Sequence, residues 1–343
     1  MSTPEKKTAI LIQTAFLGDL LLSIPLMKKM SETHEVSLIC RKGLGSFFQS
    51  LGLVHQVFEV QKSDAKSYDR VRQSFSQSVD LLVCPHMSFR SAWLAFQLPA
   101  KKKISFQTWW NFWAFDQRRK KRMGLPDALR QLDLASLWDD QILKKIDAYE
   151  NHSSVEEKQY GPVPEWASMQ VVEYQPKVTR GQKTVAIFPG SVWPTKRWTL
   201  DGFTELANKF LESGYQVVLM GGKEEVDLGQ QIQNKYPQVK SVIGQYSLLE
   251  SLQFLQTVDL VISNDSGSQH LAAAAGTPTV SIFGPTVLSQ GFRPWNSKVR
   301  IVENVGLFCR PCGKHGHKKC PRGTHECMTK ISAGQVFQAA QKL

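Results

Sequence analysis

Residues 260–278 read LVISNDSGSQHLAAAAGTP, an apolar run followed by a short polar turn and then by a run of small residues. The apolar run at 260–263 predicts a buried strand, and the small residues at 269–275 predict a tightly packed helix. A strand that leads through a short turn into a helix is the repeating unit of a doubly wound sheet. The stretch therefore predicts an α/β fold with parallel strands.

Similar apolar runs of strand length recur in both halves of the chain, with helical patterns between them. Because these runs lack the polar alternation of half-exposed strands, they predict parallel sheets that are covered on both faces. We therefore expect two Rossmann-like domains, each with a ligand crevice at the carboxyl ends of its strands. The expected strands are 8–13, 36–40, 57–60 and 81–84, and then 184–188, 216–220, 239–243, 260–263 and 279–283. The expected helices begin near 18 and span 200–213, 224–235, 248–256, 269–275 and 331–343.

The chain has 343 residues, enough for two domains that each bury a core. Polar residues, prolines and Gly181 gather between the two series of strands, which is typical of a linker. We expect an N-terminal domain at 1–165, a linker at 166–182 and a C-terminal domain at 183–343.

Hydrophobic residues make up 42% of the chain and charged residues 21%, and no apolar run is long enough for a membrane-spanning helix. Lys6 and Lys7 precede an apolar run, as in a secretory signal, but Gln13 and Asp19 interrupt that run. We therefore expect a buried first strand at the N-terminus and a cytoplasmic protein.

The turn after the strand at 260–263 is the first candidate binding site. Backbone N–H groups at a helix start carry partial positive charge, and Ser266 and Gly267 allow a diphosphate to approach them closely. His270 is expected to face the same anion. Helix capping by Asp265 and Ser266 is the alternative, but the small residues at 272–276 predict tight packing under the turn and favour a site.

A second candidate is the loop FPGSVWPTKRW at 188–198, which directly follows the first strand of the second domain. Ser191, Thr195 and Lys196 are hydroxyl and ammonium donors that suit phosphate oxygens. Positive charge here would stabilise a departing nucleoside diphosphate. A solvent-exposed basic loop is the alternative interpretation.

A third candidate is the stretch FLGDLLLSIP at 16–25, which closes the first strand of the chain. Its Asp19 is a carboxylate at the start of an otherwise aliphatic helix. It would stabilise the helix dipole, or act as a base that takes a proton from an acceptor hydroxyl. The spacing leaves both roles open.

Together and in this order, the three stretches resemble glycosyltransferase family 9, the heptosyltransferases of lipopolysaccharide assembly, and are most similar to the heptosyltransferase II type. The resemblance covers essentially the whole chain. It implies a GT-B fold, in which two Rossmann-like domains face each other across a cleft. It also implies inverting transfer of L-glycero-D-manno-heptose from ADP-heptose, with Asp19 as general base, Lys196 neutralising the diphosphate, and no cofactor required. The implied donor-binding residues are Ser191, Thr195, Arg197, Glu224 or Glu225 at the ribose, Tyr246 at the adenine, Asp265, Ser266, Gly267 and His270.

The formal net charge of +12 is concentrated in two segments, because 101–122 holds eight basic residues and one acid, and 310–330 holds six and one. A nucleic-acid binder and an anionic membrane partner both fit such charge. Trp109, Trp110 and Trp113 interleave with the basic residues of the first segment, which suits anionic lipid.

The resemblance implies a lipid A acceptor carrying Kdo or heptose. It implies peripheral contact with the inner leaflet of the cytoplasmic membrane, and no nucleic acid as a partner. The expected acceptor and membrane face comprises Lys101, Lys102, Lys103, Trp109, Trp110, Arg118 and Arg119.

Four cysteines, Cys309, Cys312, Cys320 and Cys327, cluster near the C-terminus with three histidines nearby. They provide enough ligands for tetrahedral zinc, but their spacing is not that of a zinc ribbon. A structural zinc, packed reduced thiols and disulfides all stay open.

Two other functions fit the same sequence. One is a GT-B transferase that uses another nucleotide sugar, because a fold does not fix a substrate. The other is a non-catalytic protein that keeps the nucleotide crevice and binds acidic glycolipid or nucleic acid through its basic faces.

Overall fold

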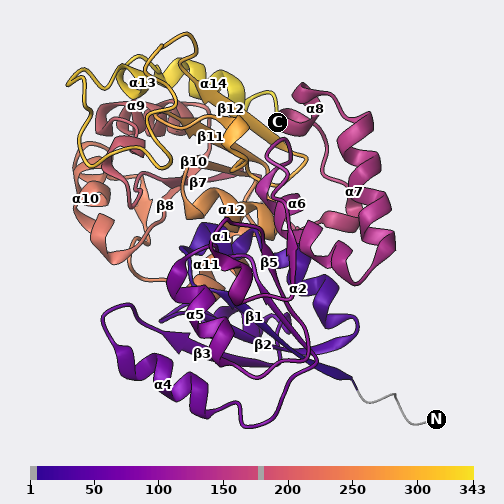
Figure 1. Ribbon diagram of the computed structural model, residues 1–343. Helices are drawn as coiled ribbons and strands as arrows, with labels where there is room; N and C mark the ends of the chain where they lie inside the picture. Colours follow the sequence, from indigo (N-terminus) through magenta and orange to yellow (C-terminus); the bar gives the residue numbers. More distant parts are fainter. Residues whose placement is uncertain (1–5, 177–180) are drawn as a thin grey trace. The chain divides into compact units, whose positions relative to one another are not determined.

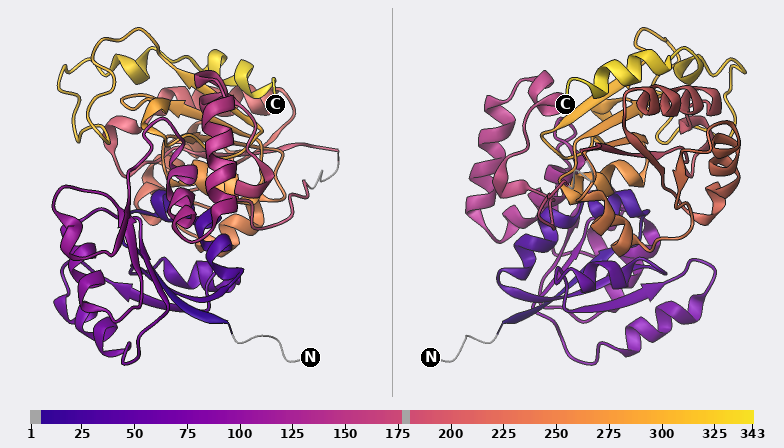
Figure 2. Two further views of the ribbon diagram at one scale, coloured as in Figure 1. Left: turned by 45° about the vertical axis from the view of Figure 1, so that its right-hand side comes forward. Right: turned by 180° about the vertical axis from the view of Figure 1, so that it is seen from behind.

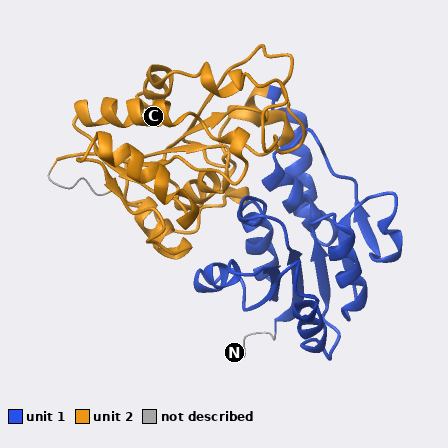
Figure 3. Ribbon diagram, turned by 90° about the vertical axis from the view of Figure 1, so that its left-hand side faces the viewer, with its two compact units in different colours: residues 1–155 blue, residues 156–343 orange. Residues whose placement is uncertain are grey.

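The computed structural model contains two six-stranded sheets in which every strand pairing is parallel. It describes residues 6–176 and 181–343. The chain divides into two units, residues 1–155 and 156–343 (Figure 3). The division lies before the predicted linker at 166–182, of which residues 177–180 lie outside the described part. The predicted boundaries stay a prediction.

The sheet of the first unit has the strand order β3-β2-β1-β4-β5-β6. Figure 1 labels β1, β2, β3 and β5 of this sheet. The chain begins at a central strand, runs outward to one edge, and then returns to the centre and runs to the other edge. This is the doubly wound order, with its switch point between β1 and β4. The strands are β1 Lys7–Gln13, β2 His34–Arg41, β3 Gln56–Val60, β4 Leu81–Cys84, β5 Lys103–Phe106 and β6 Gln117–Arg119.

The sheet of the second unit repeats this order as β12-β11-β10-β7-β8-β9, so its switch point lies between β7 and β10. All residues of β7, β10 and β11 are buried, as expected for strands covered on both faces. The strands are β7 Thr184–Phe188, β8 Gln216–Leu219, β9 Lys240–Ser241, β10 Leu260–Asn264, β11 Thr279–Phe283 and β12 Val299–Glu303.

Every strand expected from the sequence is present, and the α/β class with two Rossmann-like units is confirmed. The strand expected at 239–243 is shorter, because only Lys240 and Ser241 pair with β8. Three edge-side strands were not predicted, namely β5, β6 and β12. Of these, β6 is the sequence QRR and has no apolar residue, so no hydrophobic pattern marks it.

Helices cover both faces of the first sheet. The helices α4 and α5 pack over one hydrophobic cluster, which includes Ile10, Ile12 and Leu82 of the sheet. The expected helix near residue 18 is divided in two, α1 and α2, and buries Leu21 and Leu22 as predicted. The helical elements are α1 Leu17–Leu21, α2 Ile24–Ser31, α3 Gly45–Ser50, α4 Ala65–Gln73, α5 Phe89–Gln97, η1 Asn111–Trp113, α6 Asp127–Leu132, η2 Asp133–Leu137 and α7 Asp140–His152.

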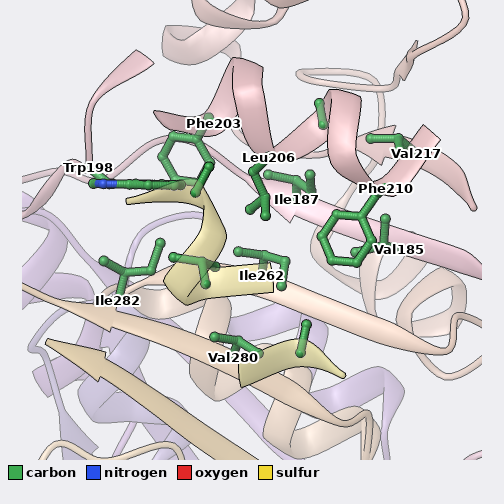
Figure 4. Close-up of a cluster of buried hydrophobic side chains, with 14 of the residues drawn as sticks. Val185, Ile187, Trp198, Phe203, Leu206, Phe210, Val217, Ile262, Val280 and Ile282 are labelled. Atoms are coloured by element: carbon green, nitrogen blue, oxygen red, sulfur yellow. The ribbon is translucent and has the colours of Figure 1, made fainter. Parts of the chain in front are cut away.

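In the second unit, α9 and α14 lie side by side on one face of the sheet (Figure 2). Phe203, Leu206 and Phe210 of α9 point onto Val185 and Ile187 of β7 (Figure 4). The helices α11 and α12 pack against each other, and α12 contacts β10 and β11. The helical elements are α8 Val155–Tyr160, η3 Glu165–Ala167, η4 Pro194–Lys196, α9 Leu200–Glu212, η5 Lys223–Glu225, α10 Val226–Lys235, α11 Leu248–Leu255, α12 Gly267–Ala275, η6 Leu288–Gln290, α13 Glu326–Thr329 and α14 Ala333–Ala340.

Among the described residues, none of the helices combines the length and the apolar character needed to cross a bilayer.

Candidate functional site

The switch point of the second sheet brings together two of the stretches singled out in the sequence. The strands β7 and β10 are paired, so the loop at 189–199 and the turn at 265–266 leave the same carboxyl edge of the sheet. Ligands of doubly wound sheets bind at this kind of edge.

The side chain of Asn264 ties the two stretches together. It is fully buried at the end of β10, and its Nδ2 donates to the carbonyl oxygens of Pro189 and Gly190 at 3.1 and 3.0 Å. Its Oδ1 accepts from the backbone N–H of Trp198 at 2.9 Å. Three hydrogen bonds from one side chain therefore fix both ends of the loop to the end of β10.

A buried ion pair lies next to this anchor. The Nζ of Lys196 lies 2.6 Å from Oδ2 of Asp265, and both side chains are buried. The same Oδ2 accepts from Thr286 Oγ1 at 2.5 Å, and Oδ1 accepts from Gln269 Nε2 at 2.9 Å. The fold thus holds one ammonium group at the start of α12.

The start of α12 has an open arrangement of backbone donors. Ser266 is the N-cap residue, but its side chain makes no capping hydrogen bond and instead contacts Ser268 Oγ at 2.6 Å. The first-turn N–H groups therefore lack the usual partner from the N-cap, as an anion site requires. His270 is buried in this first turn.

Two other predicted donor residues lie in the loop at 189–199. Ser191 is buried, and its carbonyl oxygen accepts from Nε of Arg197 at 2.7 Å. A Cβ at Gly190 would overlap the side-chain carboxylate of Glu225, so Gly190 allows Glu225 to pack closely against the loop.

Glu225, and not the exposed Glu224, packs against this edge of the sheet. Its Oε2 accepts from the backbone N–H of Gly222 at 2.6 Å. Burial raises the pKa of Glu225, although the Gly222 hydrogen bond opposes that shift. Tyr246 is partly exposed just before α11, with its ring 5.8 Å from that of Phe254.

In the first unit, Asp19 lies in α1, which follows the switch-point strand β1. Its carbonyl oxygen accepts from Ser23 Oγ at 3.0 Å and from Gln131 Nε2 at 3.1 Å. Gln13 at the end of β1 donates to Gln131 Oε1 at 3.0 Å. A buried polar network therefore fixes the backbone that carries the Asp19 carboxylate.

The model of glycosyltransferase family 9 (heptosyltransferase) matches residues 69–321. The chain belongs to glycosyltransferase family 9. It is 26% identical to lipopolysaccharide heptosyltransferase 2 of Escherichia coli K12 over 337 residues, which cover 93% of this chain and 86% of that protein.

The chain is also 32% identical to lipooligosaccharide heptosyltransferase 2 of Campylobacter jejuni serotype O:2, over 48% of this chain and 51% of that protein. The match thus spans about half the length of the Campylobacter relative. The solved E. coli ADP-heptose LPS heptosyltransferase II superposes with a TM-score of 0.71 at 18% identity, covering 97% of each chain. The GT-B fold class expected from the sequence is thereby confirmed.

In this family 9 protein, several basic side chains of the predicted acceptor and membrane face are engaged within the first unit. Lys101 pairs with Asp80 at 2.7 Å, and Lys102 Nζ donates to the Leu137 carbonyl oxygen at 2.8 Å. The Arg119 guanidinium donates to both carboxylate oxygens of buried Asp133, at 3.0 and 3.2 Å.

The remaining members of that face differ in exposure. Lys103 Nζ donates to the Phe96 carbonyl oxygen at 2.9 Å, and Arg118 is partly buried. Trp109 is 89% exposed, whereas Trp110 packs against other aromatic rings.

The four clustered cysteines of this family 9 protein, Cys309, Cys312, Cys320 and Cys327, line one cavity of about 140 Å³. Among residues 6–176 and 181–343, no three His, Cys, Asp or Glu side chains are arranged to hold a metal ion. The structural zinc therefore stays a prediction, beside reduced thiols and disulfides.

The cysteine-rich segment also supports the loop at 189–199. Thr195 Oγ1 donates to the His317 carbonyl oxygen at 2.6 Å and accepts from the His317 N–H at 2.9 Å. The Thr195 carbonyl oxygen lies 2.7 Å from His325 Nε2. A Cβ at Gly316, which has a φ of 76°, would crowd the Thr195 hydroxyl. The Thr195 hydroxyl therefore fixes the loop that carries Lys196.

The sequence interpretation missed Asn264, Thr286 and Gln269, which organise the turn, and Gln131, which holds the Asp19 backbone. Asn264 does carry a signal, because a polar amide directly after a buried strand needs partners at the edge of the sheet. Thr286 and Gln131 carry none, because their partners lie far away in the sequence.

Proposed function

We propose that this protein transfers L-glycero-D-manno-heptose from ADP-heptose to the inner core of lipopolysaccharide, with inversion at the anomeric carbon. The single observation that carries the proposal is the uncapped start of α12 beside the buried Lys196. The names of its relatives, which are heptosyltransferases, support the choice of sugar. The solved E. coli relative is an ADP-heptose LPS heptosyltransferase, which supports the choice of donor.

In this proposal the donor diphosphate binds at the N-terminus of α12. When the sugar bond breaks, the leaving ADP gains negative charge, which Lys196 and the first-turn N–H groups stabilise. A helix N-terminus contributes roughly 0.3 to 1 kcal/mol when exposed and up to about 2 kcal/mol when partly buried. These groups supply the positive charge, so we propose a reaction that needs no metal cofactor.

Asp19 is proposed as the general base that takes the proton from the acceptor hydroxyl. Ser23 and Gln131 hold its backbone carbonyl, so the carboxylate starts from a fixed position. A positioned base contributes about 10²- to 10⁴-fold in rate.

The other donor contacts follow the predicted set. Ser191, Thr195 and Arg197 would complete the phosphate loop, Thr195 chiefly through its hold on the loop. Glu225 is the better placed of the two glutamates for the ribose, because Glu224 is exposed. Tyr246 would pack on the adenine. The turn residues of this proposal are Asp265, Ser266, Gly267 and His270.

We propose residues 1–165 as the acceptor-binding domain, 166–182 as the linker and 183–343 as the donor-binding domain. The acceptor would be lipid A carrying Kdo or heptose. The enzyme would work in the cytoplasm in peripheral contact with the inner leaflet. No nucleic acid is needed as a partner.

Asp19→Asn separates an enzyme from a non-catalytic binder. We expect turnover to fall by about 10²- to 10⁴-fold, while the affinity for ADP-heptose is kept. The matched control is Asp140→Asn, which removes an exposed first-turn carboxylate from α7 in the same unit. If Asp19 acts only on the helix dipole, the two variants will have equal turnover, and the proposed base is wrong.

Competition among ADP, UDP and GDP tests the donor. We expect ADP to displace bound ADP-heptose at lower concentrations than the other two nucleotides do. Preference for UDP or GDP would point to another nucleotide sugar.

A further inference from the structure

The outer face of α5 is aromatic, although this helix covers a buried core. Phe89, Trp93 and Phe96 follow one another at spacings of four and three residues, so they lie on one side of the helix. Their exposed fractions are 63%, 46% and 49%. The buried side carries Ala92, Leu94 and Ala95. The helix α5 is therefore apolar on its outer face as well as on its buried face, whereas a surface helix usually has a polar outer face.

Rings from η1 extend this face into a continuous surface. Trp113 lies 5.9 Å from Phe89, 6.0 Å from Trp93 and 5.4 Å from Phe96, measured between ring centroids. Trp110 joins the same group, 5.7 Å from Phe89. We call these five rings, Phe89, Trp93, Phe96, Trp110 and Trp113, the aromatic surface.

Two still more exposed rings flank the aromatic surface. Trp109 is 89% exposed and Phe112 is 64% exposed. Contiguous apolar surface of this kind, with rings at its rim, marks a place where a partner binds.

The charge around the aromatic surface identifies the partner. Residues 81–115 contain no Asp or Glu, and Arg90 lies exposed on α5 itself. One acid, the exposed Asp116, follows directly, and its Oδ2 accepts from the backbone N–H of Lys103 at 2.7 Å. Lys103 Nζ lies 5.9 Å from the centroid of the Phe96 ring. Exposed Trp and Phe side chains with more basic than acidic neighbours match the headgroup region of an anionic bilayer.

We propose that the aromatic surface is a membrane-docking surface that inserts its rings into the headgroup region of a bilayer containing anionic lipid. The inference rests on the proposed function for the choice of membrane, and it deepens that function by naming the surface that binds. It differs from the predicted face at 101–119, because Lys101, Lys102 and Arg119 are already engaged within the fold. The predicted face did not include the rings of α5, which are the side chains that insert into the bilayer in this proposal.

Vesicle binding of the full chain, without donor or acceptor, tests the proposal. The probes are vesicles of phosphatidylcholine alone and vesicles in which about one third is phosphatidylglycerol. We expect salt-sensitive binding to the anionic vesicles, and roughly tenfold or greater loss of affinity in Trp93→Gln/Phe96→Gln. The matched control is Val226→Gln/Val305→Gln, which removes two exposed apolar side chains from the second unit and should bind as the wild type does.

Hydrogen exchange of the wild-type protein provides a second measurement that does not depend on the folding of a variant. Anionic vesicles should slow exchange in peptides that cover residues 86–97 and 107–115. No binding, or equal loss in both double variants, would overturn the proposal. So would a concentration-dependent dimer that Trp93→Gln/Phe96→Gln abolishes, because the surface would then bind a second copy of the chain.

The same variants separate this inference from the proposed function. On a soluble acceptor without acyl chains, Trp93→Gln/Phe96→Gln should turn over as fast as the wild type. If neither the wild type nor Trp93→Gln/Phe96→Gln turns over, the proposed function is contradicted. The vesicle measurements would still test the membrane-docking surface.

Discussion

Lys196 and Asp265 form an ion pair of 2.6 Å at the switch point of the second sheet, although 188–198 and 260–278 are separate stretches of the sequence. Side-chain exposure is 11% for Lys196 and 4% for Asp265. Thr286 and Gln269 also donate to the Asp265 carboxylate, so three groups fix its position and it in turn fixes the ammonium. The pair is formally neutral, and it positions the Lys196 ammonium at the start of α12.

Removing Lys196 should destabilise the fold, because Asp265 is left as a buried charge. We expect Lys196→Met to lower the free energy of unfolding by about 3 kcal/mol. Addition of Asp265→Asn should recover part of that loss. Urea denaturation measures both. Lys209→Met is the control, because Lys209 pairs with Glu205 at the surface at 3.5 Å, and it should cost less than about 1 kcal/mol. Equal losses in Lys196→Met and Lys209→Met would show that the pair is not buried in solution.

Asn264→Ala should weaken both the fold and the binding of ADP. The change leaves the Pro189 and Gly190 carbonyl oxygens and the Trp198 N–H without their side-chain partner. At about 1 kcal/mol for each bond, the unfolding free energy should fall by about 3 kcal/mol. Calorimetry should show weaker ADP binding. Asn264→Asp keeps the acceptor for Trp198 but turns a buried carboxylate toward the Pro189 and Gly190 carbonyl oxygens, so it should destabilise the fold at least as much as Asn264→Ala does. Unchanged ADP affinity in both variants would remove Asn264 from the site.

The cysteines should differ in their rates of alkylation. Burial raises the pKa of Cys40 and of Cys84 to about 12 and that of Cys327 to about 11. Burial also acts to raise the pKa of Cys320, but backbone N–H groups of residues 322–325 outweigh it and lower the pKa. Iodoacetamide at pH 8 should therefore modify Cys320 first, as peptide mapping by mass spectrometry would show.

The same experiment decides among the three states of the cysteine cluster. A metal site would be established if all four clustered cysteines resist alkylation, if a chelator makes them reactive, and if metal analysis finds zinc. Protection that only a reductant removes would establish disulfides.

Glu225 should make stability depend on pH. Burial raises the pKa of Glu225 in the folded state above its ordinary value of 4.5. The stability that Glu225 contributes is therefore fully present below pH 4.5 and is lost as the pH rises through the pKa of the folded state. Glu225→Gln should therefore gain stability relative to the wild type between pH 4.5 and pH 8 in urea denaturation. Exposed Glu224→Gln is the control and should show no such trend. A parallel pH profile for both variants would contradict the burial of Glu225.

The sequence predicted the central strands well, because β4, β7 and β11 are short, mainly apolar runs of strand length. The topological rule for doubly wound sheets also predicted ligand crevices at the carboxyl ends of the strands, which is where the loop at 189–199 and the turn at 265–266 lie. The hydrogen bonds of Asn264 and Gln131 could not be predicted, because they join segments brought together only by the fold. The aromatic face of α5 was missed for another reason. Aromatic residues at helical spacing usually belong to the core, so the sequence does not show that the rings of α5 are exposed.

The most direct test of the central claim is an assay of heptose transfer with purified protein. ADP-heptose is mixed with lipid A acceptors that carry Kdo alone or Kdo and one heptose, and released ADP and the acceptor mass are measured together. We expect ADP release that matches the addition of one heptose to the acceptor and that depends on Lys196 and Asp19. Binding of ADP-heptose without ADP release or any gain in acceptor mass would contradict the claim.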